Sequence, residues 1–199
     1  MSEQASVDAR LADVRLANVR LADAVLRAKA IRMLVLDVDG TLTDGRIYIG
    51  PEGEACKAFS VHDGFGLNLL RQAGLKLAIV TGRESRIVER RAAELNFDRV
   101  LQGVADKGAA LKSLAQTFGF GVQELAFMGD DWPDLAAMRQ AGLALAVANA
   151  TPEVLACAHW VSSASGGDGA VREFAHWWLA STGQLECLRQ KYQAMSQQQ

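Results

Sequence analysis

The stretch from Met33 to Thr43 reads MLVLDVDGTLT, an apolar run followed by two aspartates, a glycine and a threonine. A continuous apolar run such as Met33–Leu36 is typical of a strand buried on both faces of a parallel sheet. Ligands of open α/β sheets bind just beyond the carboxyl ends of the strands, where Asp37 and Asp39 stand. Alternation in an extended segment points both carboxylates the same way, and their repulsion favours a divalent cation. Taken alone, the stretch also fits a polar strand end closed by an Asp-Gly turn.

Composition narrows the class of protein. The chain has 199 residues, enough for one domain with a substantial core plus extensions, and its net charge is −2. It has no basic excess and no Lys/Arg patch interleaved with aromatic residues, which argues against nucleic-acid binding. No apolar run reaches the length of a membrane-spanning helix, and the N-terminus lacks a secretory apolar region. The cysteines (Cys56, Cys157 and Cys187) are too scattered for a disulfide framework or a metal cluster. We expect a cytoplasmic protein without nucleic-acid or membrane partners.

Strand and helix patterns alternate from Ile31 onwards, which predicts βαβ units and an α/β fold with a doubly wound, Rossmann-like parallel sheet. The expected strands are Met33–Leu36, Lys76–Val80, Val100–Leu101, Leu125–Met128 and Leu143–Val147. The expected helices are Phe65–Gln72, Glu84–Leu95, Lys107–Phe118, Asp134–Ala141 and one from Val171 to about Ala180. The runs Arg46–Ile49 and Ala55–Ser60 flank a Gly-Pro-Glu-Gly turn and predict a β-hairpin insertion.

We divide the chain into a helical extension over residues 1–30, a domain over 31–180 and a tail over 181–199. Residues 10–26 repeat RLADV, RLANV and RLADA, a strongly helical composition. This repeat favours a surface helix that packs on the domain or on a neighbour. We expect Ser165–Gly169 to be flexible because it is rich in glycine and serine, and the terminal MSQQQ to be disordered.

Two further motifs lie where predicted strands end or predicted helices begin. Thr81-Gly82-Arg83 follows a strand, and a hydroxyl beside helix N-terminal amides suits a phosphate, although Thr81 also fits a simple N-cap. Lys107 opens a predicted helix, where a cation is unfavourable against the helix dipole. An anion facing Lys107 would explain its place, and a solvated lysine is the alternative.

The third motif is Met128–Asp134, which reads MGDDWPD and carries three carboxylates directly after a strand. Asp130, Asp131 and Asp134 are typical of cation ligands and of the groups that support them. Together with Asp37 and Asp39 they supply the hard oxygen ligands that Mg²⁺ prefers. The sequence therefore predicts a magnesium site.

The order of these motifs resembles the haloacid dehalogenase superfamily of aspartate-nucleophile phosphatases, over roughly residues 31–180. Within it, KAFSVHDGFG (Lys57–Gly66) and GGDGAVRE (Gly166–Glu173) resemble the 3-deoxy-D-manno-octulosonate 8-phosphate (Kdo-8-phosphate) phosphatase family. The short gaps between the motifs leave no room for a large cap domain, and members of this family lack one. The resemblance implies a homotetramer in which the hairpin packs between subunits and a neighbour covers the active site.

The resemblance also implies an activity: Mg²⁺-dependent hydrolysis of Kdo-8-phosphate to Kdo and phosphate, through an aspartyl-phosphate, in lipopolysaccharide sugar synthesis. Asp37 would be the nucleophile and a Mg²⁺ ligand, and Asp39 the general acid–base with its backbone carbonyl on the metal. Asp130 would be the other Mg²⁺ ligand. The remaining implied roles are metal support for Asp131 and Asp134, and phosphoryl binding for Thr81 and Lys107.

Substrate recognition is expected from two regions. Arg83 and Arg91 lie about two turns apart on one predicted helix and share a face, where either suits a sugar-acid carboxylate. Alternatively, Arg91 is an exposed residue of a Glu-Arg-Arg run. The residues expected to line the sugar pocket, beside Asp39 and Lys107, are Ser60, His62, Asp63 and Gly64. His62 and Asn68 stand where arginine is expected in many relatives, which bears on the identity of the sugar.

Two other hypotheses for the function are open. A phosphatase for a nine-carbon sugar acid phosphate would differ mainly in its pocket residues. A non-catalytic regulatory or scaffold subunit is disfavoured because Asp37, Asp39, Lys107 and Asp130 are all present. Arg172 either closes over a neighbour's site or is a helix-surface charge. His159 and His176 lie near tryptophans and are expected to be core or interface residues.

Overall fold

A computed structural model describes residues 20–196. Its core is a six-stranded parallel sheet with the strand order β5-β4-β1-β6-β7-β8. The strands are β1 (Met33–Leu36), β4 (Lys76–Val80), β5 (Arg99–Leu101), β6 (Leu125–Gly129), β7 (Leu143–Ala146) and β8 (Trp160–Val161). Every residue of β1, β6 and β7 is buried, as the continuous apolar runs predict. The doubly wound α/β fold is confirmed.

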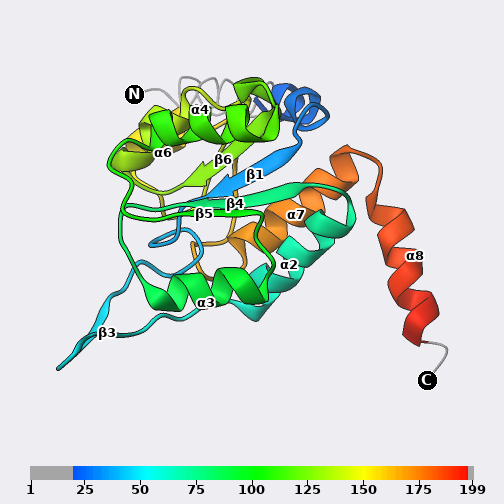
Figure 1. Cartoon of the computed structure of the whole chain (residues 1–199). Helices are drawn as coiled ribbons and strands as arrows, with labels where there is room; N and C mark the ends of the chain where they lie inside the picture. Colours follow the sequence, from blue (N-terminus) through cyan, green and yellow to red (C-terminus); the bar gives the residue numbers. More distant parts are fainter. Residues whose placement is uncertain (1–19, 197–199) are drawn as a thin grey trace, which may run out of the picture.

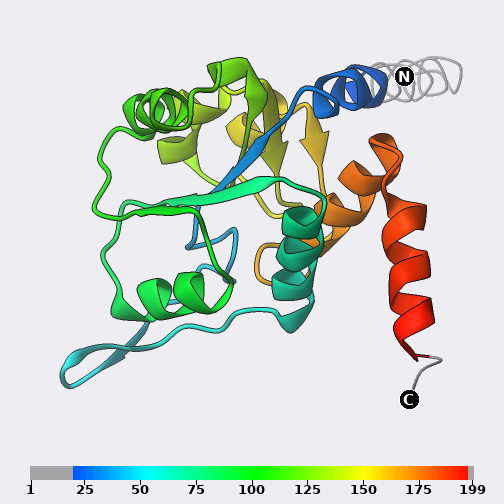
Figure 2. The ribbon, with the colours of Figure 1, turned by 45° about the vertical axis from the view of Figure 1, so that its right-hand side comes forward.

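Helices cover both faces of the sheet (Figures 1 and 2). A helix over residues 20–28, α4 (Lys107–Phe118) and α6 (Pro152–Cys157) lie on one face, and α2 (Val61–Gln72), α3 (Arg86–Glu94) and α7 (Ala170–Ser181) lie on the other. Of the N-terminal repeat, residues 10–19 lie outside the described residues and the remainder belongs to the helix over 20–28.

The predicted hairpin is present as β2 (Tyr48–Gly50) and β3 (Gly53–Cys56), an antiparallel pair that projects from the body of the molecule (Figure 1). The second strand was predicted over Ala55–Ser60, which is wrong by several residues. The chain leaves the ladder after Cys56 because Ser60 caps α2, accepting a hydrogen bond from the backbone N–H of Asp63. Helix α2 therefore begins at Val61, ahead of the predicted start at Phe65.

Other boundaries also differ from the prediction. The helix expected over Asp134–Ala141 is a 3₁₀ turn, η2 (Trp132–Asp134), followed by the short α5 (Leu135–Met138). A further 3₁₀ turn, η1 (Val122–Glu124), precedes β6, and neither β8 nor α6 was predicted. The chain after α7 forms a helix, α8 (Leu185–Ser196), so disorder was wrongly expected for Met195 and Ser196.

The glycine-rich segment Ser165–Gly169 is held in place by hydrogen bonds. The N–H of Gly166 donates to Asn149, and the N–H of Gly167 donates to the carbonyl of Thr41. A Cβ at Gly166 would lie 1.7 Å from the carbonyl oxygen of Gly40. These glycines serve the close approach of two backbones beside the end of β1, a role that composition alone does not separate from flexibility.

The tryptophan cluster is part of the core. Trp160 packs edge-to-face on Phe174 with ring centroids 5.6 Å apart, and Trp178 is buried with its indole N–H donating to the carbonyl of Ala28. His159 Nδ1 accepts a hydrogen bond from the backbone N–H of Ala144, in keeping with the structural role expected for it. Across residues 20–196, no helix is both long enough and apolar enough to span a membrane.

Candidate active site

Three neighbouring strands bring the predicted motifs together. Strands β4, β1 and β6 are adjacent and parallel, so the residues that follow them lie along one edge of the sheet. Asp37 follows β1, Thr81 follows β4 and Asp130 follows β6. Thr81 is buried and is held by its backbone, whose N–H donates to Leu101 and whose carbonyl accepts from Val104.

The carboxylates of Asp37, Asp130 and Asp134 form an acidic cluster in which one oxygen of each lies within 4.8 Å of the others. Burial, and then the charge of Asp134, raise the pKa of Asp37 to about 6 against the opposing effect of Lys107. Burial, and then the charges of Asp37 and Asp134, raise the pKa of Asp130 to about 7. Three crowded carboxylates with an all-oxygen donor set fit a divalent cation of the Mg²⁺ type.

Gly40 allows Asp130 to reach this cluster. Its φ is +101°, and a Cβ there would lie 2.0 Å from a carboxylate oxygen of Asp130. The next residue, Thr41, donates its hydroxyl to the other oxygen of Asp130 at 3.1 Å. Glycine is therefore required for two reasons, the left-handed backbone and the space that the carboxylate occupies.

Lys107 enters the cluster from the first residue of α4. Its Nζ lies 2.7 Å from Asp37 Oδ1 and 2.6 Å from Asp134 Oδ1, and its side chain is buried. Burial lowers the pKa of Lys107, but Asp37 and Asp134 more than reverse this, and the net shift is upward. The side chain therefore stays an ammonium that faces anions, which accounts for its place at a helix N-terminus.

Asp134 and Asp131 have different places. Asp134 is buried, and its Oδ2 accepts hydrogen bonds from the backbone N–H of Asp130 at 3.0 Å and of Asp131 at 3.3 Å. It thereby fixes the loop that carries Asp130. Asp131 is exposed, and its carboxylate accepts from the N–H of Trp132. Asp134 is therefore the residue that supports Asp130, whereas Asp131 caps the turn that begins at Trp132.

A second charged cluster surrounds Asp39. The ammonium of Lys57, whose side chain is only 1% exposed, donates to Asp39 Oδ1 and lies 2.9 Å from Glu54 Oε1. Arg83 Nε lies 3.7 Å from Asp39 Oδ2. Sequence reasoning missed Lys57 and Glu54 as site residues, although Lys57 opens the quoted KAFSVHDGFG motif.

Opposite charges in this second cluster keep Lys57 and Glu54 ionised. Burial lowers the pKa of Lys57, but its hydrogen bonds to Asp39 and Glu54 raise it overall. Burial raises the pKa of Glu54, but hydrogen bonds from Ser85 and Lys57 lower it overall.

The arginines do not share a helix face as predicted. Ser85 caps α3 by accepting a hydrogen bond from the N–H of Val88, so the helix begins at Arg86 and Arg83 lies in the preceding loop. Arg91 lies on α3, where it pairs with Glu94 at 2.9 Å. Its Nη2 would be 2.6 Å from a Cβ at Gly64, so Arg91 packs against the start of α2.

The pocket residues predicted on α2 divide into two groups. Ser60 and His62 lie at the beginning of α2, and His62 is exposed. Asp63 is buried, and its carboxylate accepts hydrogen bonds from the N–H of Gly169 at 3.2 Å and of Arg172 at 2.8 Å. Both of its oxygens are thus engaged at the start of α7, and its place in a sugar pocket stays a prediction. The guanidinium of Arg172 lies 4.9 Å from the Phe65 ring centroid within the same chain.

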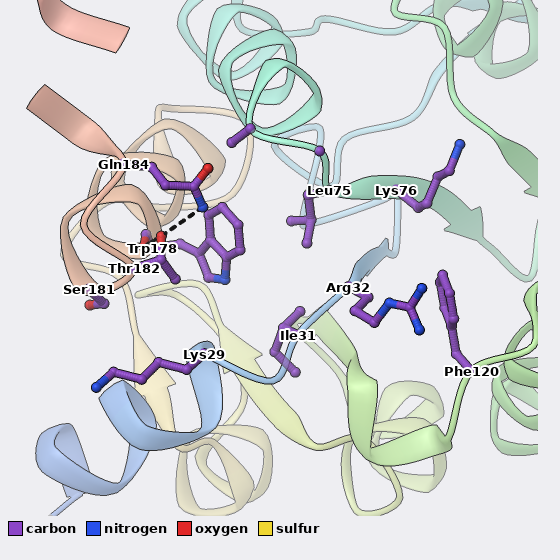
Figure 3. Close-up of a pocket in the computed structure, with 12 residues that line it drawn as sticks. Lys29, Ile31, Arg32, Leu75, Lys76, Phe120, Trp178, Ser181, Thr182 and Gln184 are labelled. Carbon is purple, nitrogen blue, oxygen red and sulfur yellow. Dashed lines mark hydrogen bonds between the residues drawn. The ribbon is translucent and has the colours of Figure 1, made fainter. Parts of the chain in front are cut away.

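The cavity in Figure 3 has a volume of about 480 Å³ and lies at the opposite end of the sheet, where the strands β1 and β4 begin. It is lined by residues that precede β1 and β4, among them Ile31, Arg32 and Leu75. Arg32 stacks over Phe120 at 4.1 Å, and Gln184 donates to Thr182 (Figure 3). None of the predicted site residues lines this cavity, which is therefore separate from the acidic cluster.

Comparison with known proteins agrees with this geometry. The model of the haloacid dehalogenase-like hydrolase family matches residues 99–174. The 3-deoxy-D-manno-octulosonate 8-phosphate phosphatase of Yersinia pestis is 42% identical over 162 residues, which cover 81% of this chain and 87% of that relative. The Escherichia coli (strain K12) enzyme of the same name is 40% identical over 162 residues, 81% of this chain and 86% of its own.

Solved structures similar to this chain include phosphatases of the same kind. The 3-deoxy-D-manno-octulosonate 8-phosphate phosphatase of Moraxella catarrhalis, in complex with magnesium ion, phosphate ion and a KDO molecule, is 40% identical with a TM-score of 0.83. The alignment covers 85% of this chain and 97% of that one. The cobalt-bound Haemophilus influenzae phosphatase is 36% identical with a TM-score of 0.78, covering 80% and 93% of the two chains.

Proposed function

Because the chain belongs to the 3-deoxy-D-manno-octulosonate 8-phosphate phosphatase family of haloacid dehalogenase-like hydrolases, we propose that it hydrolyses Kdo-8-phosphate to Kdo and phosphate. The observation that carries the proposal is the contact of Asp37 with Lys107 inside the acidic cluster. A carboxylate can accept a phosphoryl group as a nucleophile, and a buried ammonium beside it can balance the charge that develops on the phosphoryl oxygens.

Asp37 attacks phosphorus in the first step. A bond forms between its carboxylate oxygen and phosphorus, the bond from phosphorus to the sugar oxygen breaks, and protonated Asp39 gives its proton to that oxygen. In the second step Asp39 takes a proton from water as the water oxygen attacks phosphorus. The bond between Asp37 and phosphorus then breaks and inorganic phosphate leaves.

Lys107 and Thr81 hold the phosphoryl oxygens during both steps. Lys107 is fixed between Asp37 and Asp134, so its charge is in place before the substrate arrives. Preorganised charge of this kind stabilises the transition state without a reorganisation cost. The Thr81 hydroxyl lies at the end of β4, next to the strand that carries Asp37.

The acidic cluster is the magnesium site of this proposal. Asp37, Asp130 and the backbone carbonyl of Asp39 would hold the ion, and Asp134 would orient the loop of Asp130. When bound, Mg²⁺ neutralises charge on the phosphoryl oxygens.

Sugar recognition is assigned to the side chains around Asp39. Arg83 reaches Asp39 and is half exposed, so it can offer its guanidinium to the carboxylate of a sugar acid. Ser60, His62, Gly64 and Arg91 complete the proposed pocket from the adjoining ends of α2 and α3.

We also propose a cytoplasmic homotetramer that serves lipopolysaccharide sugar synthesis. The hairpin supports the assembly because it projects from the domain and exposes Ile47, Tyr48 and Ile49, the last with 76% of its surface accessible. Apolar side chains exposed together on a projecting element mark a protein–protein contact.

The proposal is tested by initial rates of phosphate release, with Mg²⁺, from Kdo-8-phosphate and from a nine-carbon nonulosonate 9-phosphate. We expect kcat/KM to be at least about tenfold higher for Kdo-8-phosphate, a difference of about 1.4 kcal/mol in transition-state binding. A preference for the nine-carbon substrate would replace the proposed function with the alternative one.

A further inference from the structure

We propose that Lys57 and Glu54 are positioning residues that hold the Asp39 carboxylate where it exchanges a proton with the substrate. This inference rests on the proposed phosphatase function and goes beyond it, because it links the hairpin to the proton-transfer step. Neither residue touches the acidic cluster of Asp37, Asp130 and Asp134 in the described structure.

Lys57 is the centre of this arrangement. A buried ammonium is costly unless anions surround it, and Lys57 meets this requirement with Asp39 on one side and Glu54 on the other. Its side chain is 1% exposed, which leaves little freedom to move. Lys57 is therefore built as a fixed contact for Asp39, and it has almost no surface to offer a substrate.

Glu54 fixes Lys57 in turn. It lies on β3 of the hairpin, and its Oε2 accepts a hydrogen bond from the hydroxyl of Ser85, the N-cap residue of α3. The hairpin and the start of α3 thus meet at one carboxylate. The orientation of Asp39 depends through Lys57 on how the hairpin is seated.

The two oxygens of Asp39 are not equivalent. Oδ1 is bound by the buried Lys57, whereas Oδ2 faces the half-exposed Arg83 across 3.7 Å, which is beyond hydrogen-bond distance. Oδ2 is therefore the oxygen left to meet the leaving group and, later, the attacking water. Without Lys57, both oxygens would rotate freely and the productive geometry would be populated less often.

The test compares two leaving groups. p-Nitrophenolate leaves without a proton, whereas the alkoxide of a primary-alcohol phosphate needs the proton of Asp39. In Mg²⁺-loaded Lys57→Met we expect the first turnover of the alkyl ester to slow by about 10²-fold or more, and that of p-nitrophenyl phosphate to change less than about threefold. Quenched-flow measurement gives both rates.

The second step provides a readout other than rate. Asp39 must act as base whatever the leaving group, so the variant should accumulate enzyme phosphorylated on Asp37 with p-nitrophenyl phosphate. Intact-mass measurement after an acid quench detects this species. The ester concentration that half-saturates the first-turnover rate should stay nearly constant for both esters, because Lys57 acts through Asp39 and has no contact with the substrate.

Matched variants separate positioning from folding. Lys57→Arg should recover part of the alkyl-ester rate, and Glu54→Gln should show the same selectivity with a smaller loss. Lys76→Met is the control, since Lys76 also pairs with an aspartate (Asp98, 2.7 Å) but lies where β4 begins, at the opposite edge of the sheet. It should leave both rates unchanged.

Equal slowing of both esters in the first turnover, or no slowing, would overturn the inference. Lys57→Met cannot be used if thermal unfolding shows that it does not fold. In that case Glu54→Gln decides the outcome, by the ratio of its first-turnover rates on the alkyl ester and on p-nitrophenyl phosphate. A wild-type enzyme inactive on Kdo-8-phosphate would refute only the proposed substrate, because the comparison uses any alkyl phosphate that it hydrolyses. A wild-type protein that hydrolyses neither ester would overturn both proposals.

Discussion

Lys107 Nζ lies 2.7 Å from Asp37 Oδ1, although one residue begins α4 and the other follows β1. The same nitrogen lies 2.6 Å from Asp134 Oδ1, so a single ammonium is shared by two buried carboxylates. This contact orients Asp37, the proposed nucleophile, before any ligand binds. It also makes the charge balance of the cluster sensitive to each of its members.

Asp37→Asn should abolish phosphate release and keep the fold. The amide oxygen is a far weaker nucleophile than a carboxylate, so we expect kcat to fall by at least about 10⁴-fold. Phosphate release and thermal unfolding measure the two effects. Asp23→Asn, in a surface pair with Arg27, is the matched control and should remain active. Substantial turnover by Asp37→Asn would remove Asp37 as the nucleophile.

The metal-free protein should lose stability as pH rises from about 4 to about 7. The folded pKa values of Asp37 (about 6) and Asp130 (about 7) both exceed the ordinary value of 3.8, so the native state binds more protons than the unfolded chain in this range. For Asp130 the loss is on the order of 2–4 kcal/mol. Urea unfolding in EDTA at several pH values measures it.

Asp130→Asn supplies the comparison for this pH effect, because an amide does not titrate. Its stability should fall less steeply over the same range, and saturating Mg²⁺ should stabilise the wild type more at pH 8 than at pH 5, where protons compete for the carboxylates. If the free energy of unfolding of the two metal-free proteins depended on pH in the same way, the raised pKa of Asp130 would be contradicted.

Asp63→Ala should destabilise the protein without a selective effect on substrate binding. The change leaves the N–H groups of Gly169 and Arg172 without their acceptor, at a cost of about 1–3 kcal/mol. Chemical unfolding gives the free energy, and KM for Kdo-8-phosphate should change less than about twofold. A large rise in KM with normal stability would instead place Asp63 in the sugar pocket.

Ile49→Glu should break the proposed tetramer. Ile49 is the most exposed of the hairpin's apolar side chains, and a charge there would have to be desolvated in a subunit contact. Light scattering after size-exclusion chromatography gives the mass. Met195→Glu, an exposed apolar site on α8, is the control and should assemble like the wild type. A tetrameric Ile49→Glu protein would place the interface elsewhere.

Much of the fold was predictable because its signals are local. The buried strands are continuous apolar runs, and β1, β4, β6 and β7 lie where those runs stand. Helix boundaries were predicted less well, since α2 and α3 begin where Ser60 and Ser85 accept a hydrogen bond from the backbone. Serine is common outside caps, so its presence alone does not decide where a helix begins.

The sequence by itself determined which side chains meet at the carboxyl ends of the central strands. In a parallel sheet, residues that follow adjacent strands must converge, which brings Asp37, Thr81 and Asp130 together once the strands are known. Only the tertiary structure decided which side chains surround Asp39 and what Asp63 binds. Lys57 and Arg83 reach Asp39 from separate segments, and Glu54 pairs with Lys57. Asp63 meets the start of α7 more than a hundred residues later. Such contacts depend on how the hairpin and α7 pack, and no local pattern encodes that packing.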